Sequence, residues 1–293
     1  MTKAEKFRAF LDRCYVVLHS MLPTNFLSWL MFHIAQIRSS GFKNAFIGIF
    51  VKLYKVDLSE AEFEIVKSYP DFSSFFTRAL KPNARPIDPD PSVLISPVDG
   101  YVSALGPIRN GTMIQAKGHA YTVAELLGGS KAAALFGKGS FCTLYLAPHN
   151  YHRIHMPTSG KLREWGYVPG RLFSVSARAV RTIPKLFARN ERVFSIFETD
   201  YGPLAVVMVG ALFVGSIETA WNGRVTPPHG HEAGGYTPMN PVVLMRGREM
   251  GRFNMGSTVI LLAPPGMVAW RPHLIANKEV RMGLALASMA KIR

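Results

Sequence analysis

The sequence has little cysteine and little acidic charge. Its 293 residues include two cysteines, Cys14 and Cys142, in unrelated apolar segments, which argues against a disulfide framework and favours a reducing compartment. Asp and Glu number 19 against 34 Lys and Arg, a formal net charge of +15 that indicates an anionic partner. Since no zinc finger, tandem basic run or RNA-binding aromatic pattern accompanies this charge, we expect an anionic membrane surface and no nucleic acid.

Charge is also missing from residues 14–37, a stretch long enough to span a bilayer. Pro23 interrupts this stretch, so we predict two shorter helices instead of one span. The aromatic and apolar residues of 26–34 and 42–53, with lysines beside them, are typical of amphipathic helices that lie in a membrane interface. A helical cap packed on the main core is the alternative. The N-terminus resembles neither a secretory signal nor a transit peptide, so we expect it to stay on the protein.

The remainder of the chain has a mainly β pattern. From Val93 onward, short apolar runs alternate with Gly, Pro and Asn turns, and we predict an α+β fold with a mainly-β core after N-terminal helices. Asp57 to Glu60 is predicted to start a helix. We place the boundary after residue 62, giving a helical membrane-association region at 1–62 and a second domain at 63–293. The expected strands include 143–146, 193–197, 204–209, 242–245 and 259–262.

Gly256-Ser257-Thr258 places a hydroxyl group after a residue with no side chain and before a buried apolar run. Gly256 leaves its carbonyl carbon open on both faces, and the run 259–262 predicts a strand in the core. A serine in this position can attack its own backbone. An ordinary turn before a strand is the alternative.

A hydroxyl nucleophile needs a base and a group that orients the base. His149, His152 and His155 follow an apolar strand, and Asp99 lies in the turn Ser-Pro-Val-Asp-Gly. Three histidines can indicate a metal site, but no further ligand has suitable spacing and prolines flank the segment, so we expect no metal. A turn residue that binds its own backbone is the alternative for Asp99.

These three segments, in this order, resemble the phosphatidylserine decarboxylases. The resemblance covers roughly residues 65–266 and is specific because so many ordered segments match. The further matching segments are 71–78, 85–87, 166–170, 172–175, 186–192, 214–218 and 249–253.

The resemblance implies a self-processing enzyme. Ser257 would attack the Gly256 carbonyl, and the chain would separate into a β chain, 1–256, and an α chain, 257–293, that begins with a pyruvoyl group made from Ser257. That group would form a Schiff base with phosphatidylserine, which would lose CO₂ to give phosphatidylethanolamine. The resemblance gives Asp99, His155 and Ser257 as the triad for cleavage, with His155 as the general base, and His152 as a histidine needed for decarboxylation.

The expected substrate is an anionic lipid in a bilayer. We predict Arg78, Arg153 and Ser174 as contacts to its phosphate or carboxylate group, and Tyr167 and Phe173 as the lining of a lipid channel. The resemblance also implies a homodimer and a peripheral enzyme on the cytoplasmic side of the inner membrane. Basic groups near an anionic membrane surface contribute about 1 kcal/mol each to binding.

Three other functions remain open from the sequence alone. A serine hydrolase would use Asp99, His155 and an intact Ser257. A membrane-binding relative without enzymatic activity would bind lipid but release no CO₂. A pyruvoyl decarboxylase of soluble amino acids is disfavoured by the apolar N-terminal residues 14–56.

Overall fold

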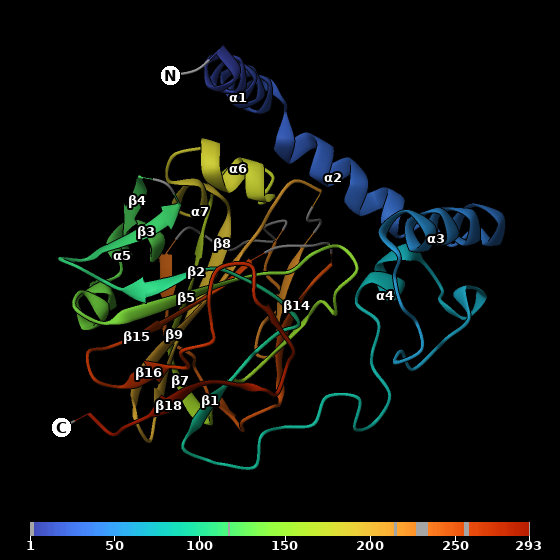
Figure 1. Cartoon of the computed structure of the whole chain (residues 1–293). Helices are drawn as coiled ribbons and strands as arrows, with labels where there is room; N and C mark the ends of the chain where they lie inside the picture. The colour runs from blue at the N-terminus through green and yellow to red at the C-terminus, as the bar shows by residue number, and fades with distance from the viewer. Residues whose placement is uncertain (1–2, 117, 214–215, 227–233, 255–257, 293) are drawn as a thin grey trace.

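The structure, a computed structural model, describes residues 3–116, 118–213, 216–226, 234–254 and 258–292. A β-rich body forms most of the molecule, and three N-terminal helices make a row that extends beyond one of its edges (Figure 1). The helices are α1 Lys3–Met21, α2 Thr24–Ala35 and α3 Ser40–Tyr54. This arrangement confirms the α+β class predicted from the sequence.

Pro23 separates α1 from α2, as predicted. It stands at the N-cap of α2, where its missing N–H group costs no helical hydrogen bond. The predicted helices at 26–34 and 42–53 are confirmed, since they lie within α2 and α3. In the described ranges, no helix is both long and apolar enough to cross a membrane.

A small aromatic core joins α3 to the segment that follows it. Phe46 and Phe50 of α3 pack on Phe72 of the short helix α4 Phe72–Phe76, with ring centroids 4.4 and 5.0 Å apart. The side chain of Asp71 caps α4 by accepting a hydrogen bond from the Ser74 N–H. This core reaches from residue 35 to residue 76, so the segment directly after the predicted boundary packs with the helices.

The helix predicted to start between Asp57 and Glu60 is wrong. Asp57 Oδ1 accepts a hydrogen bond from the Ser59 N–H at 2.8 Å, and the chain makes a turn there. A side chain that bonds the backbone two residues ahead offers the chain an alternative to helix. A 3₁₀ helix follows at Val66–Ser68.

The largest sheet has nine antiparallel strands in the described residues. Its order is β12-β7-β8-β9-β15-β5-β2-β17, with β13 also beside β7. The strands are β2 Gly100–Pro107, β5 Ser140–Tyr145, β7 Gly160–Val168, β8 Arg192–Thr199, β9 Gly202–Val209, β12 Gly234–Tyr236, β13 Val243–Leu244, β15 Thr258–Ala263 and β17 Glu279–Val280.

Smaller sheets and short helices surround this sheet. One sheet has the order β11-β10-β14-β6, a second has the order β1-β18-β16, and β3 pairs with β4. Their strands are β1 Val93–Ile95, β3 Thr112–Ala116, β4 His119–Thr122, β6 Arg153–His155, β10 Ile217–Thr219, β11 Gly223–Arg224, β14 Glu249–Phe253, β16 Val268–Trp270 and β18 Ala285–Met289. The remaining helices are α5 Val123–Leu126, the 3₁₀ helix Lys131–Phe136, α6 Ala177–Thr182 and α7 Leu186–Arg189.

β15 lies in the middle of the main sheet and of the core. Each of its six residues is buried, and it pairs with β5 on one side and β9 on the other. Its continuous apolar run is the pattern expected of a strand covered on both faces. The predicted strand at 259–262 is therefore confirmed.

Candidate active site

The first residue of β15 marks the site. Thr258 pairs with Tyr145 at the end of β5 and with Val209 at the end of β9. Gly256 and Ser257, the predicted cleavage site, lie outside the described residues. Thr258, the described residue that follows them in the chain, stands at the end of the sheet where β5 and β9 both end.

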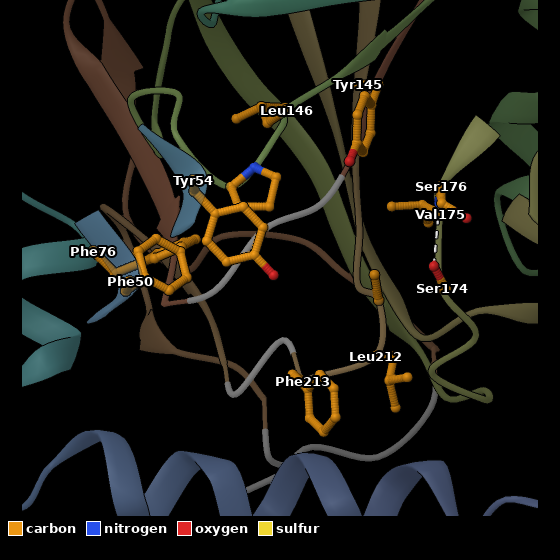
Figure 2. A pocket seen from close by; sticks show the side chains of 12 residues that line it. Phe50, Tyr54, Phe76, Tyr145, Leu146, Ser174, Val175, Ser176, Leu212 and Phe213 are labelled. Carbon is orange, nitrogen blue, oxygen red and sulfur yellow. Dashed lines mark hydrogen bonds between the residues drawn. The ribbon is translucent and has the colours of Figure 1, made fainter. Parts of the chain in front are cut away.

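A mostly apolar cavity of about 330 Å³ opens at this end of the sheet. The segments directly after β5 and β9 form two of its walls, and the loop before α6 forms another (Figure 2). In Figure 2, the hydroxyl groups of Tyr54 and Tyr145 point toward the space between the labelled side chains. The lining residues are Phe50, Tyr54, Phe76, Tyr145, Leu146, Pro148, Ser174, Val175, Ser176, Ala211, Leu212 and Phe213.

The N-terminal helices help to build this cavity. Phe50 and Tyr54 of α3 and Phe76 of α4 supply one side of its lining. In α2, the buried Ser28 hydroxyl accepts a hydrogen bond from the Phe213 N–H at 3.0 Å. The helices are therefore part of the wall, and α2 holds the loop that carries Phe213.

His152 is completely buried beside the cavity. Its ring stacks on Phe76 with centroids 4.1 Å apart, and its Nε2 lies 3.1 Å from the Ala147 carbonyl oxygen. Because a carbonyl can only accept, Nε2 carries the proton and Nδ1 has the lone pair. Burial, with a further effect from Arg78, lowers the pKa of His152 to about 3, so the ring is neutral at neutral pH.

His155 is the last residue of β6. Its N–H donates to the Pro97 carbonyl at 2.9 Å, which brings the strand against the turn that contains Asp99. Its Nδ1 lies 2.8 Å from the Gly247 carbonyl oxygen, and its Nε2 lies 2.9 Å from the Tyr151 hydroxyl. Burial lowers the pKa of His155 below its ordinary value of 6.5, which keeps the ring neutral and able to accept a proton at neutral pH.

Asp99 does not orient His155 in this structure. Its carboxylate accepts from the Arg85 Nε at 2.9 and 3.0 Å and from the Met282 N–H at 2.9 Å. The Gly247 carbonyl occupies the Nδ1 position where the triad would have Asp99. The backbones of the two segments are brought together as expected, but the side chains of Asp99 and His155 have different partners.

Asp99 lines a second, polar cleft of about 180 Å³. Arg78, predicted as a phosphate contact, lies on its wall with Nη2 donating to the His149 carbonyl at 2.8 Å, and burial lowers the pKa of this guanidinium. Tyr151 lines the same cleft, so the cleft reaches the group that contacts His155. Arg153, the other predicted cation, pairs with Glu249 at 3.0 Å.

Ser174, predicted as a phosphate or carboxylate contact, lines the cavity, but the two predicted lipid-channel residues do not. Tyr167 instead lies on β7, where its hydroxyl donates to Glu191 at 2.9 Å. Phe173 is buried with the Arg189 guanidinium 4.8 Å from its ring centroid. Neither aromatic ring is among the residues around the cavity, so their predicted role gains no support from their positions.

Three contributors at the site were missed from the sequence. Tyr151 and Arg85 both stand in matched motifs, so they could have been selected. Tyr151 and His155 meet across a non-helical segment, however, and Arg85 lies 14 positions from Asp99. Gly247 acts through its backbone carbonyl, which leaves no side-chain pattern.

Comparison with known proteins gives a consistent family. Residues 72–288 match the family described as Phosphatidylserine decarboxylase, and residues 15–55 match one described as PSD. A phosphatidylserine decarboxylase proenzyme of Pseudomonas fluorescens is 51% identical over 282 residues, 94% of this chain and 96% of that protein. Proenzymes of the same description from Nitrosococcus oceani and Bordetella avium are 51% and 50% identical, with 92% and 94% of this chain and 89% and 95% of those proteins aligned.

The buried pair of Arg85 and Asp99 generates a prediction about stability. Arg85→Met leaves the Asp99 carboxylate buried without its cation, which should lower the free energy of unfolding by about 3–5 kcal/mol. Adding Asp99→Asn should restore most of the loss, because the amide is neutral and keeps an acceptor for the Met282 N–H. Urea unfolding of chains that also carry Ser257→Ala would measure this on one intact polypeptide.

The matched control for this prediction is Arg163→Met, which breaks an exposed pair with Glu198 and should cost less than about 1 kcal/mol. Equal losses for the Arg85 and Arg163 variants would contradict the interpretation that Asp99 depends on Arg85.

Proposed function

The chain belongs to the phosphatidylserine decarboxylase family, and from this premise we propose which of its residues perform the reaction. It is a carboxy-lyase that acts on phosphatidylserine, and it is made as a proenzyme that is cleaved into α and β chains. Its cofactor is a pyruvoyl group derived from a serine. Its residues then have two tasks, the cleavage that makes the cofactor and the decarboxylation that uses it.

We assign the cleavage to Ser257, with His155 as its general base. The supporting observation is that Thr258, which follows Ser257 in the chain, starts the central strand β15 where two neighbouring strands end. In this proposal the Ser257 oxygen attacks the Gly256 carbonyl carbon while His155 takes the hydroxyl proton at Nε2. His155 suits this step because burial keeps its ring neutral.

Asp99 is proposed to act through position and not through a direct bond to His155. Its carboxylate joins Arg85, which precedes β1 in the chain, to the Met282 N–H, which follows β17. This bond holds the turn at Pro97, and the Pro97 carbonyl in turn accepts from the His155 N–H. Loss of Asp99 would therefore displace the base.

The residues at the start of β15 fit a small carbonyl-bearing group. Within the described residues, the buried Thr258 Oγ1 has no hydrogen-bond partner, and the neighbouring cavity offers space. When present, a pyruvoyl group supplies a carbonyl that draws electrons from the substrate as its carboxylate leaves. Thr258, Tyr145 and Val209 are the residues that would surround it, because they pair across the start of the strand.

His152 is proposed to serve the decarboxylation. It is neutral and packs behind Phe76, which lines the cavity, so it can set the shape of that wall while its Nδ1 stays unprotonated. In this state it is not a cation and cannot bind phosphate as one. A role as a proton donor would require it first to gain a proton at Nδ1.

We propose that the apolar cavity receives the lipid substrate. Its size lies within the range of small-molecule sites, and its lining is mostly aliphatic and aromatic with a few hydroxyl groups. It is bounded by both the N-terminal helices and the β body, so a lipid held by the helices would have a short path to the start of β15. Ser174 is the proposed polar contact among its walls.

Residues 1–62 are proposed as the membrane-association region, with 63–293 as the catalytic part. The helices carry large apolar side chains on their surface, and the net charge of +15 favours an anionic bilayer. Attachment to the cytoplasmic face of the inner membrane and a homodimer rest on the family resemblance. The exposed apolar side chains of the helices include Phe7, Phe10, Val17, Leu18, Met21, Phe26, Trp29, Leu30, Ile49 and Leu53.

The assignment of the two histidines predicts different products. Purified wild-type protein should give a fragment of about 4 kDa for residues 257–293 with a blocked N-terminus. His155→Ala should give one intact species of 32.5 kDa, because the base is lost. His152→Gln should still give the fragment but release little CO₂. Mass spectrometry and CO₂ release would measure these outcomes.

Two results would contradict the assignment. An intact wild-type chain would exclude cleavage at Gly256-Ser257, and an uncleaved His152→Gln chain would mean that both histidines serve one step.

The cavity predicts a separation of binding from cleavage. Ser174→Trp should lower decarboxylation at least about tenfold, because the indole fills space that the lipid needs, and should leave self-cleavage in place. Ser174→Ala, the size control, should lower the rate of decarboxylation by less than about tenfold, which is the effect of losing one hydrogen bond. The assay is CO₂ release from phosphatidylserine in detergent. Full activity of Ser174→Trp would place the substrate elsewhere.

The exposed apolar surface of α2 predicts weaker membrane binding when its aromatic side chains are replaced by alanine. Phe26→Ala with Trp29→Ala should lower binding to vesicles that contain phosphatidylglycerol by at least about tenfold, since each side chain is at least half exposed on α2. Co-sedimentation would measure it. Ile114→Ala with Met239→Ala removes apolar groups of the β body that are more exposed than those two rings, and is the control. Equal binding of both double variants and wild type would contradict docking through α2.

A further inference from the structure

The hydrogen bonds of His155 fix which of its nitrogens is the base. The Gly247 carbonyl, 2.8 Å from Nδ1, can only accept, so Nδ1 carries the proton. The neutral ring then has its lone pair on Nε2, and the Tyr151 hydroxyl, 2.9 Å away, donates to it. The group in contact with the basic nitrogen is therefore Tyr151, which the family resemblance had not indicated.

Tyr151 is suited to hold this contact. Its side chain is buried at 7% exposure, and burial raises the pKa of its hydroxyl, which stays protonated over the working range of pH. The single lone pair of Nε2 takes one donor at a time, so the hydroxyl donates to the neutral ring at rest, turns away as the Ser257 proton arrives, and then accepts from the N–H of the imidazolium. A hydrogen bond to a charged group contributes more than one between neutral groups, so Tyr151 stabilises the imidazolium more than the imidazole.

The other groups around His155 do not supply this hydrogen bond to Nε2. Glu249 on β14 and Asp99 in the turn before β2 favour its protonated form, and Arg153 on β6 opposes it. Asp99 is engaged by Arg85, Glu249 pairs with Arg153, and the Gly247 carbonyl carries no net charge. Among the described residues, none of these three groups is hydrogen-bonded to Nε2, whereas Tyr151 is.

We propose that Tyr151 is a positioning residue for self-cleavage: its hydroxyl fixes the ring of His155 and stabilises the imidazolium that forms when His155 takes up a proton. The inference rests on the proposed role of His155 as general base. A triad aspartate both stabilises the charge of the histidine and orients its ring. Here Tyr151 stabilises the charge and the Gly247 carbonyl helps to orient the ring.

The test is the pH dependence of self-cleavage in Tyr151→Phe, which keeps the ring and removes the hydroxyl. Full-length chain made by cell-free synthesis would be shifted to pH values between about 4.5 and 8, and release of the 257–293 fragment followed in time. Cleavage should slow by about ten- to one-hundredfold, the effect of losing one hydrogen bond to a charged group. The acidic limb of the profile should move to lower pH, because the imidazolium loses its partner.

Tyr69→Phe is the matched control, since Tyr69 is also buried and its hydroxyl donates to a backbone oxygen, that of Phe63, away from His155. It should cleave at the wild-type rate. Urea unfolding of Tyr151→Phe in the Ser257→Ala chain would show whether the fold is kept. If the fold is kept, an unchanged rate overturns the inference, and so does a slower rate with an acidic limb that stays in place or moves toward 6.5. Cleavage by His155→Ala would overturn the proposed base itself.

Discussion

The pairing of β15 with strands on both sides is the constraint on which the site depends. β9 and β5 hold this strand in the core, so its first residue, Thr258, is fixed at the end of the sheet. The segments that continue from β9 and β5 must separate there, and the cavity opens between them. The strands after the cleavage position also pair with the earlier chain, β17 with β2 and β18 with β1. Breaking one peptide bond before Thr258 would leave these ladders intact.

The same cavity connects the two parts of the molecule. Its walls come from the β body and from α3 and α4, and the aromatic core that joins those helices also includes Phe76, the residue stacked on His152. Through Ser28 and Thr24, α2 is bonded to the loops that carry Phe213 and Leu172. A movement of α2 or α3 would therefore act on the cavity wall directly.

The sequence predicted best where the signal is local. Continuous apolar runs gave the central strands, Pro23 gave the break between α1 and α2, and the ordered motifs gave the family. The prediction failed at Asp57, where a side-chain bond to the Ser59 N–H competes with helix formation. It also did not identify the partners of Asp99. Met282 meets Asp99 only after β17 has paired with β2, and Arg85 reaches it from a loop 14 positions earlier. Tyr167 and Phe173 show the same limit of sequence-based prediction, because the residue type alone does not reveal which cavity a buried ring faces.

The two histidines show how backbone geometry can divide chemistry between neighbouring residues. His152 gives its Nε2 proton to the Ala147 carbonyl, whereas His155 gives its Nδ1 proton to the Gly247 carbonyl, so their lone pairs lie on opposite nitrogens. Burial lowers both pKa values, so each ring is neutral at neutral pH. Neither carbonyl can be read from side-chain patterns, yet together they set which atom of each ring can accept a proton. Two histidines three residues apart can thus serve different steps without exchanging roles.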